Sequence, residues 1–204
     1  MITERSYQRI VVIGIVAAGL LLGQAQPATA SEAAEDFIQH CADDVSAILS
    51  NQSETLREKR SDIWQIIDRS TNSEQLARAT LGNYAAGLPQ REIDRYVRAF
   101  RRYMRFHFAG ELASASSLDL RVTGSSETRR SHATRVSSKV SLSGGEEREV
   151  DWRVADDEFI TDVQVDGLWL ISDLKSRINT LLLESNGNIT AAVDYINRDL
   201  PDDD

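Results

Sequence analysis

The chain has 204 residues, with 32 acidic and 23 basic side chains and a formal net charge of −9 at pH 7. Because such a chain repels phosphate, the charge argues against a nucleic acid partner and against permanent attachment to an anionic membrane. The only cysteine, Cys41, cannot form an internal disulfide, so packing must stabilise the fold.

The first 30 residues are typical of a cleaved secretory signal peptide. Arg5 and Arg9 precede an uncharged apolar stretch, which is followed by small residues before a cleavage position after Ala30. The stretch is shorter than the roughly 20 residues of a membrane-spanning helix, although an uncleaved inner-membrane anchor is the alternative. We therefore expect a periplasmic protein with a single domain over residues 31–200 and a disordered tail at 201–204.

Residues 31 to about 114 follow a helical period. A first apolar stripe begins at Phe37, and a second short helix is expected around Ile63–Ile67. Ser73 is expected to cap a third helix that ends at Gly87, and Pro89 then suits the first turn of a long helix. That helix presents one apolar face over about five turns, formed by Ile93, Tyr96, Val97, Phe100, Tyr103, Met104 and Phe108.

From Leu118 the period changes to two, which predicts four strands with one apolar face each. The inward-facing residues are expected to be Leu118, Leu120, Val122, Val136, Ser138, Val140, Leu142, Trp152, Val154, Phe159, Thr161, Val163 and Val165. Asp162 falls on the polar face. Hairpin turns at 143–145 and 156–158 predict a meander, at least for the last three strands.

The helical period returns after Asp166-Gly167 and predicts two C-terminal helices. Asn186-Gly187 ends the first of them, and Asn188 can cap the second. Helices on either side of the sheet are available to cover its apolar face, so the sequence predicts an α+β fold.

Motifs for catalysis, metals or cofactors are absent from the sequence. It has no phosphate-binding glycine loop, no nucleophile-elbow serine and no histidine pair at metal-binding spacing. Two dibasic pairs, Arg101-Arg102 and Arg129-Arg130, are candidate contacts for a lipid phosphate or an acidic partner. The apolar faces of the long helix and the sheet are compatible with either a packed core or a ligand cavity.

Several stretches resemble the MlaC family of periplasmic lipid-transport proteins, including its toluene-tolerance and hopanoid-associated relatives. These stretches are Leu76–Tyr84, Pro89–Arg91 with Phe100–Met104, Val150–Val154, Asp162–Gly167, and Lys175–Ile178 followed by Asn186-Gly187. The sequence departs from the family pattern at Ala85, Phe159, Trp169, Leu170, Lys175 and Ile178.

The resemblance implies a curved antiparallel sheet with helices packed around an apolar cavity, like a cone. It implies a monomeric carrier, without cofactor or enzymatic activity, that shuttles phospholipid between an outer-membrane lipoprotein complex and an inner-membrane ABC transporter complex. The expected lipid-binding wall is Phe100, Tyr103, Met104, Phe108, Val122, Val140, Trp152, Val154, Val163 and Val165, with Trp169 and Leu170 near the mouth. The same residues could equally form ordinary core.

Three alternatives remain open from the sequence. The ligand could be a hopanoid or another polycyclic lipid in the same fold. The chain could be an enzyme of a cone-like fold, which would need a buried Asp, His or Tyr in the cavity. It could also be an interaction module with a solid core.

Overall fold

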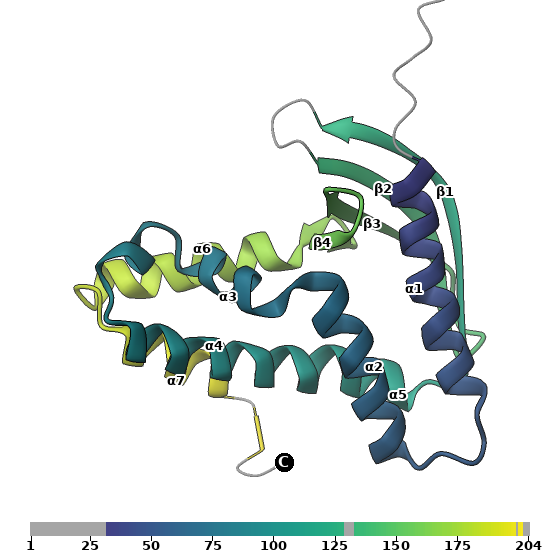
Figure 1. Ribbon diagram of the computed structural model, residues 1–204, viewed down its shortest axis with the longest axis horizontal. Helices are drawn as coiled ribbons and strands as arrows, with labels where there is room; N and C mark the ends of the chain where they lie inside the picture. The colour runs from purple at the N-terminus through teal and green to yellow at the C-terminus, as the bar shows by residue number, and fades with distance from the viewer. Residues whose placement is uncertain (1–31, 129–132, 199, 202–204) are drawn as a thin grey trace, which may run out of the picture.

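The computed structural model describes residues 32–128, 133–198 and 200–201. The predicted signal peptide, the Arg129-Arg130 pair and the last three residues of the predicted tail lie outside these residues. The elements follow the order helices, sheet, helices, so the predicted α+β class is confirmed (Figure 1).

The N-terminal helical part comprises α1 (Glu32–Ser50), α2 (Leu56–Thr71), α3 (Ser73–Leu81), a 3₁₀ helix (Gly82–Gly87), α4 (Gln90–Met104), a π-helical turn (Arg105–Ala109) and α5 (Gly110–Ser114). The strands are β1 (Leu118–Thr128), β2 (Ala133–Leu142), β3 (Arg148–Ala155), β4 (Phe159–Val165) and β5 (Leu168–Trp169). The C-terminal helices are α6 (Leu170–Glu184) and α7 (Ile189–Asn197).

The sheet is a five-stranded antiparallel meander in the order β1-β2-β3-β4-β5. The predicted count of four strands is therefore one too low. Asp166 and Gly167 both have positive φ, at 51° and 84°, and form a tight turn that returns the chain onto β4. Trp169 then pairs with Gln164, which makes β5 a two-residue edge strand.

Two helices begin earlier than periodicity predicts. Helix α2 starts about two turns before Ile63, its first buried apolar residue, because Thr55 and Glu58 form a reciprocal capping box. The cap of α3 is Asn72, whose side chain accepts a hydrogen bond from the backbone N–H of Gln75, and Ser73 is the first helical residue. The polar cap residues, not the apolar stripe, set both starts.

The predicted long helix is divided in the structure. Helix α4 ends at Met104, and a π-helical turn over Arg105–Ala109 connects it to α5. A π turn inserts an extra residue into the helical repeat, so side chains after Met104 point in directions that a regular helix would not give.

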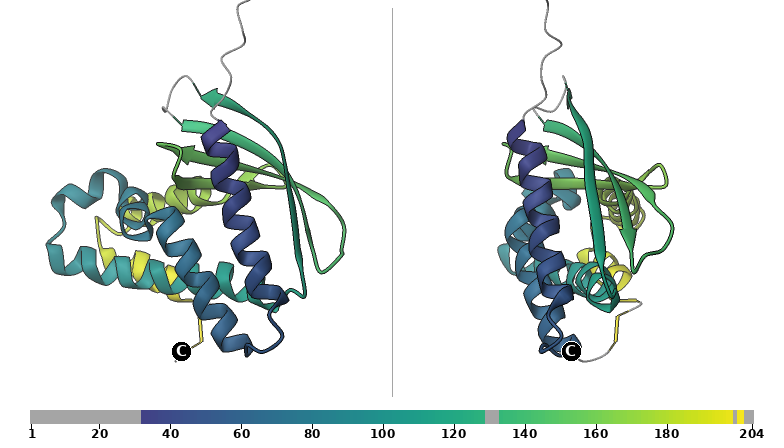
Figure 2. Two further views of the ribbon diagram at one scale, coloured as in Figure 1. Left: turned by 45° about the vertical axis from the view of Figure 1, so that its right-hand side comes forward. Right: turned by 90° about the vertical axis from the view of Figure 1, so that its right-hand side faces the viewer.

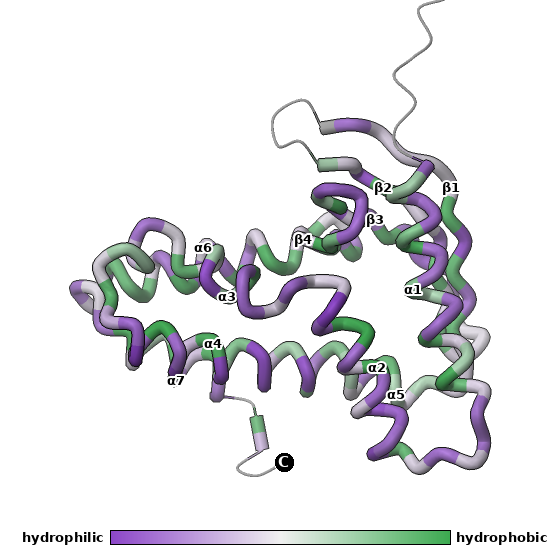
Figure 3. The backbone as a smooth tube through the Cα atoms, viewed as in Figure 1, coloured by the Kyte–Doolittle hydropathy of each residue, from purple (hydrophilic) through white to green (hydrophobic). Residues whose placement is uncertain are grey.

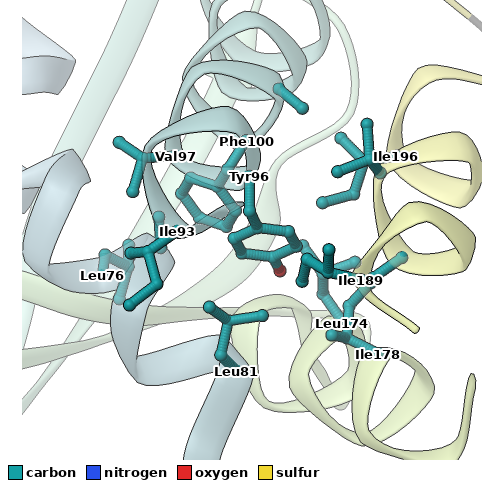
Figure 4. Close-up of a cluster of buried hydrophobic side chains, with 14 of the residues drawn as sticks. Leu76, Leu81, Ile93, Tyr96, Val97, Phe100, Leu174, Ile178, Ile189 and Ile196 are labelled. Carbon is teal, nitrogen blue, oxygen red and sulfur yellow. The ribbon is translucent and has the colours of Figure 1, made fainter. Parts of the chain in front are cut away.

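Helices α3, α4, α6 and α7 pack together on one side of the molecule, and α6 begins beside β4 of the sheet (Figure 1). Tyr96 lies at the centre of this cluster and is fully buried (Figure 4). Its hydroxyl is 2.7 Å from the Thr80 hydroxyl, so the buried polar group has a partner. Burial raises the pKa of Tyr96 far above its ordinary value.

The end of α6 confirms the predicted stop. Asn186 and Gly187 adopt positive φ of 53° and 80°, and the Gly187 N–H donates to the Leu182 carbonyl at 2.7 Å. This is a Schellman motif, in which left-handed residues satisfy the last carbonyls of a helix. Asn188 caps α7 by accepting from the backbone N–H of Thr190, as predicted.

The buried apolar residues form three clusters rather than one. The first lies among α3, α4, α6 and α7, and the second joins α1, α2 and α5. In the third, α1 packs across one face of the curved sheet (Figure 2), where Ala34 and Ile38 meet Val136, Val154 and Ile160. A binding site is therefore expected where the three clusters meet.

Candidate functional site

A pocket of about 720 Å³ lies where the three clusters meet. Each cluster contributes to its wall: Leu76 and Met104 come from the first, Val45 and Ile66 from the second, and Ile38 from the third. The wall is mostly aliphatic and aromatic. The volume of the pocket falls within the range of about 300–1,000 Å³ that is usual for sites holding apolar small molecules.

More than half of the wall residues expected from the sequence line this pocket. The wall residues from the sheet occupy inward-facing positions of neighbouring strands. Trp152 and Val163, for example, are directly paired across β3 and β4. The expected residues that the structure places in the wall are Met104, Phe108, Val140, Trp152, Val163, Val165 and Leu170.

The other expected residues lie outside the pocket. Phe100 is fully buried beside Tyr96 in the first cluster, because it sits more than one turn back along α4. Val154 is fully buried under α1 in the third cluster, and Val122 packs at its margin. These three side chains pack against neighbouring side chains and do not line the pocket.

Tyr103 and Trp169 also lie outside the pocket wall. Tyr103 packs against the first cluster, with its ring centroid 4.5 Å from that of His107. The Trp169 indole lies under the Arg153 guanidinium, which is 3.8 Å from the ring centroid. Because β5 pairs with β4 at the edge of the sheet, Trp169 is fixed beside Arg153 instead of at the mouth.

The sequence reasoning missed the wall contributed by the first two helices. Ile38, Cys41, Ala42 and Val45 line the pocket from α1, and Ile66 and Ile67 line it from α2. The apolar stripe of α1 was visible in the sequence. What the stripe could not reveal is which of its residues face the sheet and which face an unfilled space.

Alternation along β4 also predicts the wrong burial for two residues, Phe159 and Ile160. The pairing of β3 with β4 shifts between Arg153 and Val154, so that Val154 pairs with Ile160 and Arg153 with Asp162, and Thr161 is the extra residue. Such a bulge changes which residues face inward. Ile160 is therefore buried in place of the expected Phe159, while Val163 and Val165 keep their inward positions.

Asp162 is buried, with 3% of its surface exposed, and the prediction of a solvent-facing position is wrong. The start of α6 packs over it, and its carboxylate accepts hydrogen bonds from the backbone N–H groups of Ile171 at 2.8 Å and Ser172 at 3.1 Å. Arg153 forms an ion pair with it at 3.2 Å. Asp162 thus caps a helix whose own N-cap residue, Trp169, provides no side-chain hydrogen bond.

Cys41 is half-buried in the pocket wall. Its burial disfavours the charged thiolate and raises the pKa of the thiol from 9.0 to about 11, an effect only partly offset by nearby Arg69. At neutral pH the side chain is therefore a neutral thiol, and it behaves as part of the apolar surface.

Exposed residues mark the open side of the pocket. They include Glu111 from α5 and Leu142, Glu146 and Arg148 from the β2–β3 hairpin. Arg148 pairs with exposed Asp166 at 3.0 Å. The wall is therefore charged at the rim and largely apolar inside.

Two other kinds of site were sought over the described ranges. No group of three or more His, Cys, Asp or Glu residues within them is arranged to hold a metal ion. None of the helices described is both long enough and apolar enough to cross a membrane.

The family model described as MlaC protein matches residues 39–198. The chain belongs to the MlaC family. This result confirms the resemblance read from the sequence, and the match extends from α1 to the end of α7.

A solved structure shares the fold of this chain. The chain is similar to a phospholipid-binding protein from Ralstonia solanacearum, solved in complex with a phospholipid, with a TM-score of 0.68 and 17% sequence identity. The similarity covers 81% of this chain and 95% of that protein. A search of curated proteins found no match.

Proposed function

We propose that this MlaC-family protein is a periplasmic carrier that holds a phospholipid by its acyl chains in the pocket. The observation that carries the proposal is the apolar space left where three hydrophobic clusters fail to merge. A phospholipid in the related Ralstonia solanacearum structure supports the same ligand class for this fold.

The chemistry of the wall suits a carrier. Hiding about 30 methylene groups from water is worth roughly 24 kcal/mol, at about 0.8 kcal/mol each. A bilayer hides the same groups equally well, so the protein only needs to match the membrane for the lipid to leave again. The aliphatic lining meets this need because no strong polar contact must break when the tails depart.

The headgroup is expected at the charged rim. There, Arg148 can approach a lipid phosphate, and the outward direction keeps the polar group in water. We further propose that the protein shuttles its lipid, after cleavage of the leader, between an outer-membrane lipoprotein complex and an inner-membrane ABC transporter complex.

The enzymatic alternative loses its best candidate residue. A catalytic acid or base must be free to exchange a proton with a substrate. The carboxylate of Asp162 is already occupied by Ile171, Ser172 and Arg153. We therefore assign Asp162 a structural role.

Native mass spectrometry of the purified protein tests the proposal. We expect an added mass that matches a phospholipid, identified after solvent extraction. Cys41→Trp should abolish this mass, because the larger side chain occupies the space of the tails. Ala33→Trp, at an exposed position of the same helix, should retain it.

Extraction also distinguishes the alternatives. A hopanoid in the extract would change the ligand while keeping the pocket. A protein that is free of lipid after gentle purification, and that takes up none from phospholipid vesicles, would contradict the carrier function.

A further inference from the structure

A second pocket, of about 320 Å³, lies on the outer side of α2 and α4, apart from the lipid pocket. No residue belongs to both walls. The wall of this second pocket consists of Arg60, Trp64, Arg98, Arg101, Arg102, Arg105, Phe106 and Pro201. No acidic side chain from the described part of the chain lines it, although the chain as a whole carries a net charge of −9.

The arginines converge because of their spacing. Arg98 lies three residues before Arg101 and four before Arg102, so these three share one face of α4. Arg105, at the start of the π turn, lines the same pocket. The opposite face of α4 is buried in the first cluster, and hydrophilic and hydrophobic segments alternate along the helix (Figure 3). Like charges on one helix face repel one another, and a bound anion would offset this repulsion.

Only part of this positive charge is neutralised within the described residues. Arg101 pairs with Asp68 at 2.6 Å, and its guanidinium lies 5.8 Å from the centre of the Trp64 ring. Its Nε is buried and has no hydrogen-bond partner among the described residues. Arg102 donates to the Pro201 carbonyl. Arg98 and Arg105 are exposed and form no ion pair with any described residue.

We propose that this arginine pocket binds a phosphate group. Several guanidinium groups around one small space match an anion with several oxygens and more than one charge, whereas a single carboxylate is satisfied by one guanidinium. The phosphate belongs either to a lipid headgroup at a membrane surface or to a free phosphate, and the experiment distinguishes these sources. The site is separate from the lipid pocket and does not depend on the proposed function.

Titration calorimetry of the purified mature protein with inorganic phosphate forms the first arm. Co-sedimentation with vesicles that contain phosphatidylglycerol, compared with neutral phosphatidylcholine vesicles, forms the second. The test variant is Arg98→Ala/Arg105→Ala. The control, Arg91→Ala/Lys175→Ala, removes the same charge from exposed positions outside the pocket.

We expect the test variant to weaken binding at least tenfold in one or both arms and the control to stay within twofold. Binding in the calorimetric arm alone identifies free phosphate, and binding to anionic vesicles identifies a headgroup. The Trp64 indole resonance, assigned through Trp64→Phe, should shift with phosphate.

Equal binding by the test and control variants, or no binding in either arm, would overturn the proposal. So would a glutamate-rich peptide that binds through Arg98 and Arg105 more tightly than phosphate does. The amount of bound lipid, measured by native mass spectrometry, should be the same in all variants. A negative result in the phosphate experiments therefore does not contradict the proposed carrier function.

Discussion

Cys41 illustrates how the pocket determines the chemistry of a single residue. From the sequence alone, it is only the single cysteine that cannot form an internal disulfide. In the structure it is half-buried and faces the pocket, and burial raises its pKa to about 11. A low-pKa, exposed cysteine reacts readily, whereas a thiol with this pKa stays neutral near pH 7.

Alkylation of Cys41 by iodoacetamide should be slow at pH 8 and should accelerate as the pH rises towards about 11, because only the thiolate reacts. A shift from 9.0 to about 11 lowers the thiolate fraction about a hundredfold at pH 8. Intact-mass spectrometry at several pH values measures the rate.

The control is Ala33→Cys in a Cys41→Ser background, which places the thiol at an exposed position of the same helix. Bound lipid should slow the reaction of Cys41 further and leave the control unchanged. Equal rates for the two cysteines at pH 8 would show that Cys41 is not shielded by the pocket.

At the scale of elements, periodicity predicted most helices and strands because one face of each is buried. It failed where another interaction decided the local geometry. The bulge at Thr161 depends on the pairing of β4 with β3, and the edge strand at Trp169 depends on the turn that returns the chain onto β4. The π turn after Met104 is a local change of backbone hydrogen bonding, from the Gly110 N–H to the Arg105 carbonyl, which the spacing of apolar residues does not encode. The inward direction of Asp162 depends on α6 packing over β4, which no local pattern indicates.

The start of α6 should depend on Asp162. Asp162→Ala should lower the free energy of unfolding by about 2 kcal/mol, because two backbone N–H groups and Arg153 lose their partner. Asp162→Asn should have a smaller effect, because one oxygen acceptor remains. Urea denaturation followed by circular dichroism measures both.

Asp173 provides the comparison, since it lies in the first turn of the same helix and forms a surface pair with Arg177. Asp173→Ala should cost under about 0.5 kcal/mol. If Asp162→Ala were no more destabilising than Asp173→Ala, the capping role would be refuted.

At the scale of the whole molecule, the family and the arrangement of layers could be inferred from the sequence, but the pocket could not. Apolar faces on a helix and a sheet are compatible with either a filled core or a cavity. Phe100 and Met104 lie on the same face of α4, yet one is enclosed in the first cluster and the other reaches the pocket. Only the positions of neighbouring elements separate these outcomes.

Because the pocket joins three clusters, a bound lipid should stabilise the entire fold. A ligand present at about 100 times its dissociation constant adds about 2.7 kcal/mol, which for a protein of this size raises the melting temperature by roughly 5–10 °C. We expect delipidated protein to melt lower by this amount in calorimetry and to recover when lipid is restored.

The pocket-filling variant Cys41→Trp is the matched control. Its melting temperature should not respond to lipid, because the space is already occupied. A wild-type protein whose melting temperature is the same with and without lipid would show that the ligand does not bridge the clusters.

The wall of the pocket draws on α1 near the beginning of the described chain and on α6 near its end. Ile38 and Ile171 are thus separated by most of the protein but border one space. Such a binding site cannot form until the last long-range contacts are made, because loop closure must precede them. A newly made chain must therefore finish folding before it can bind a lipid, and a partly synthesised chain would have no pocket for the acyl chains.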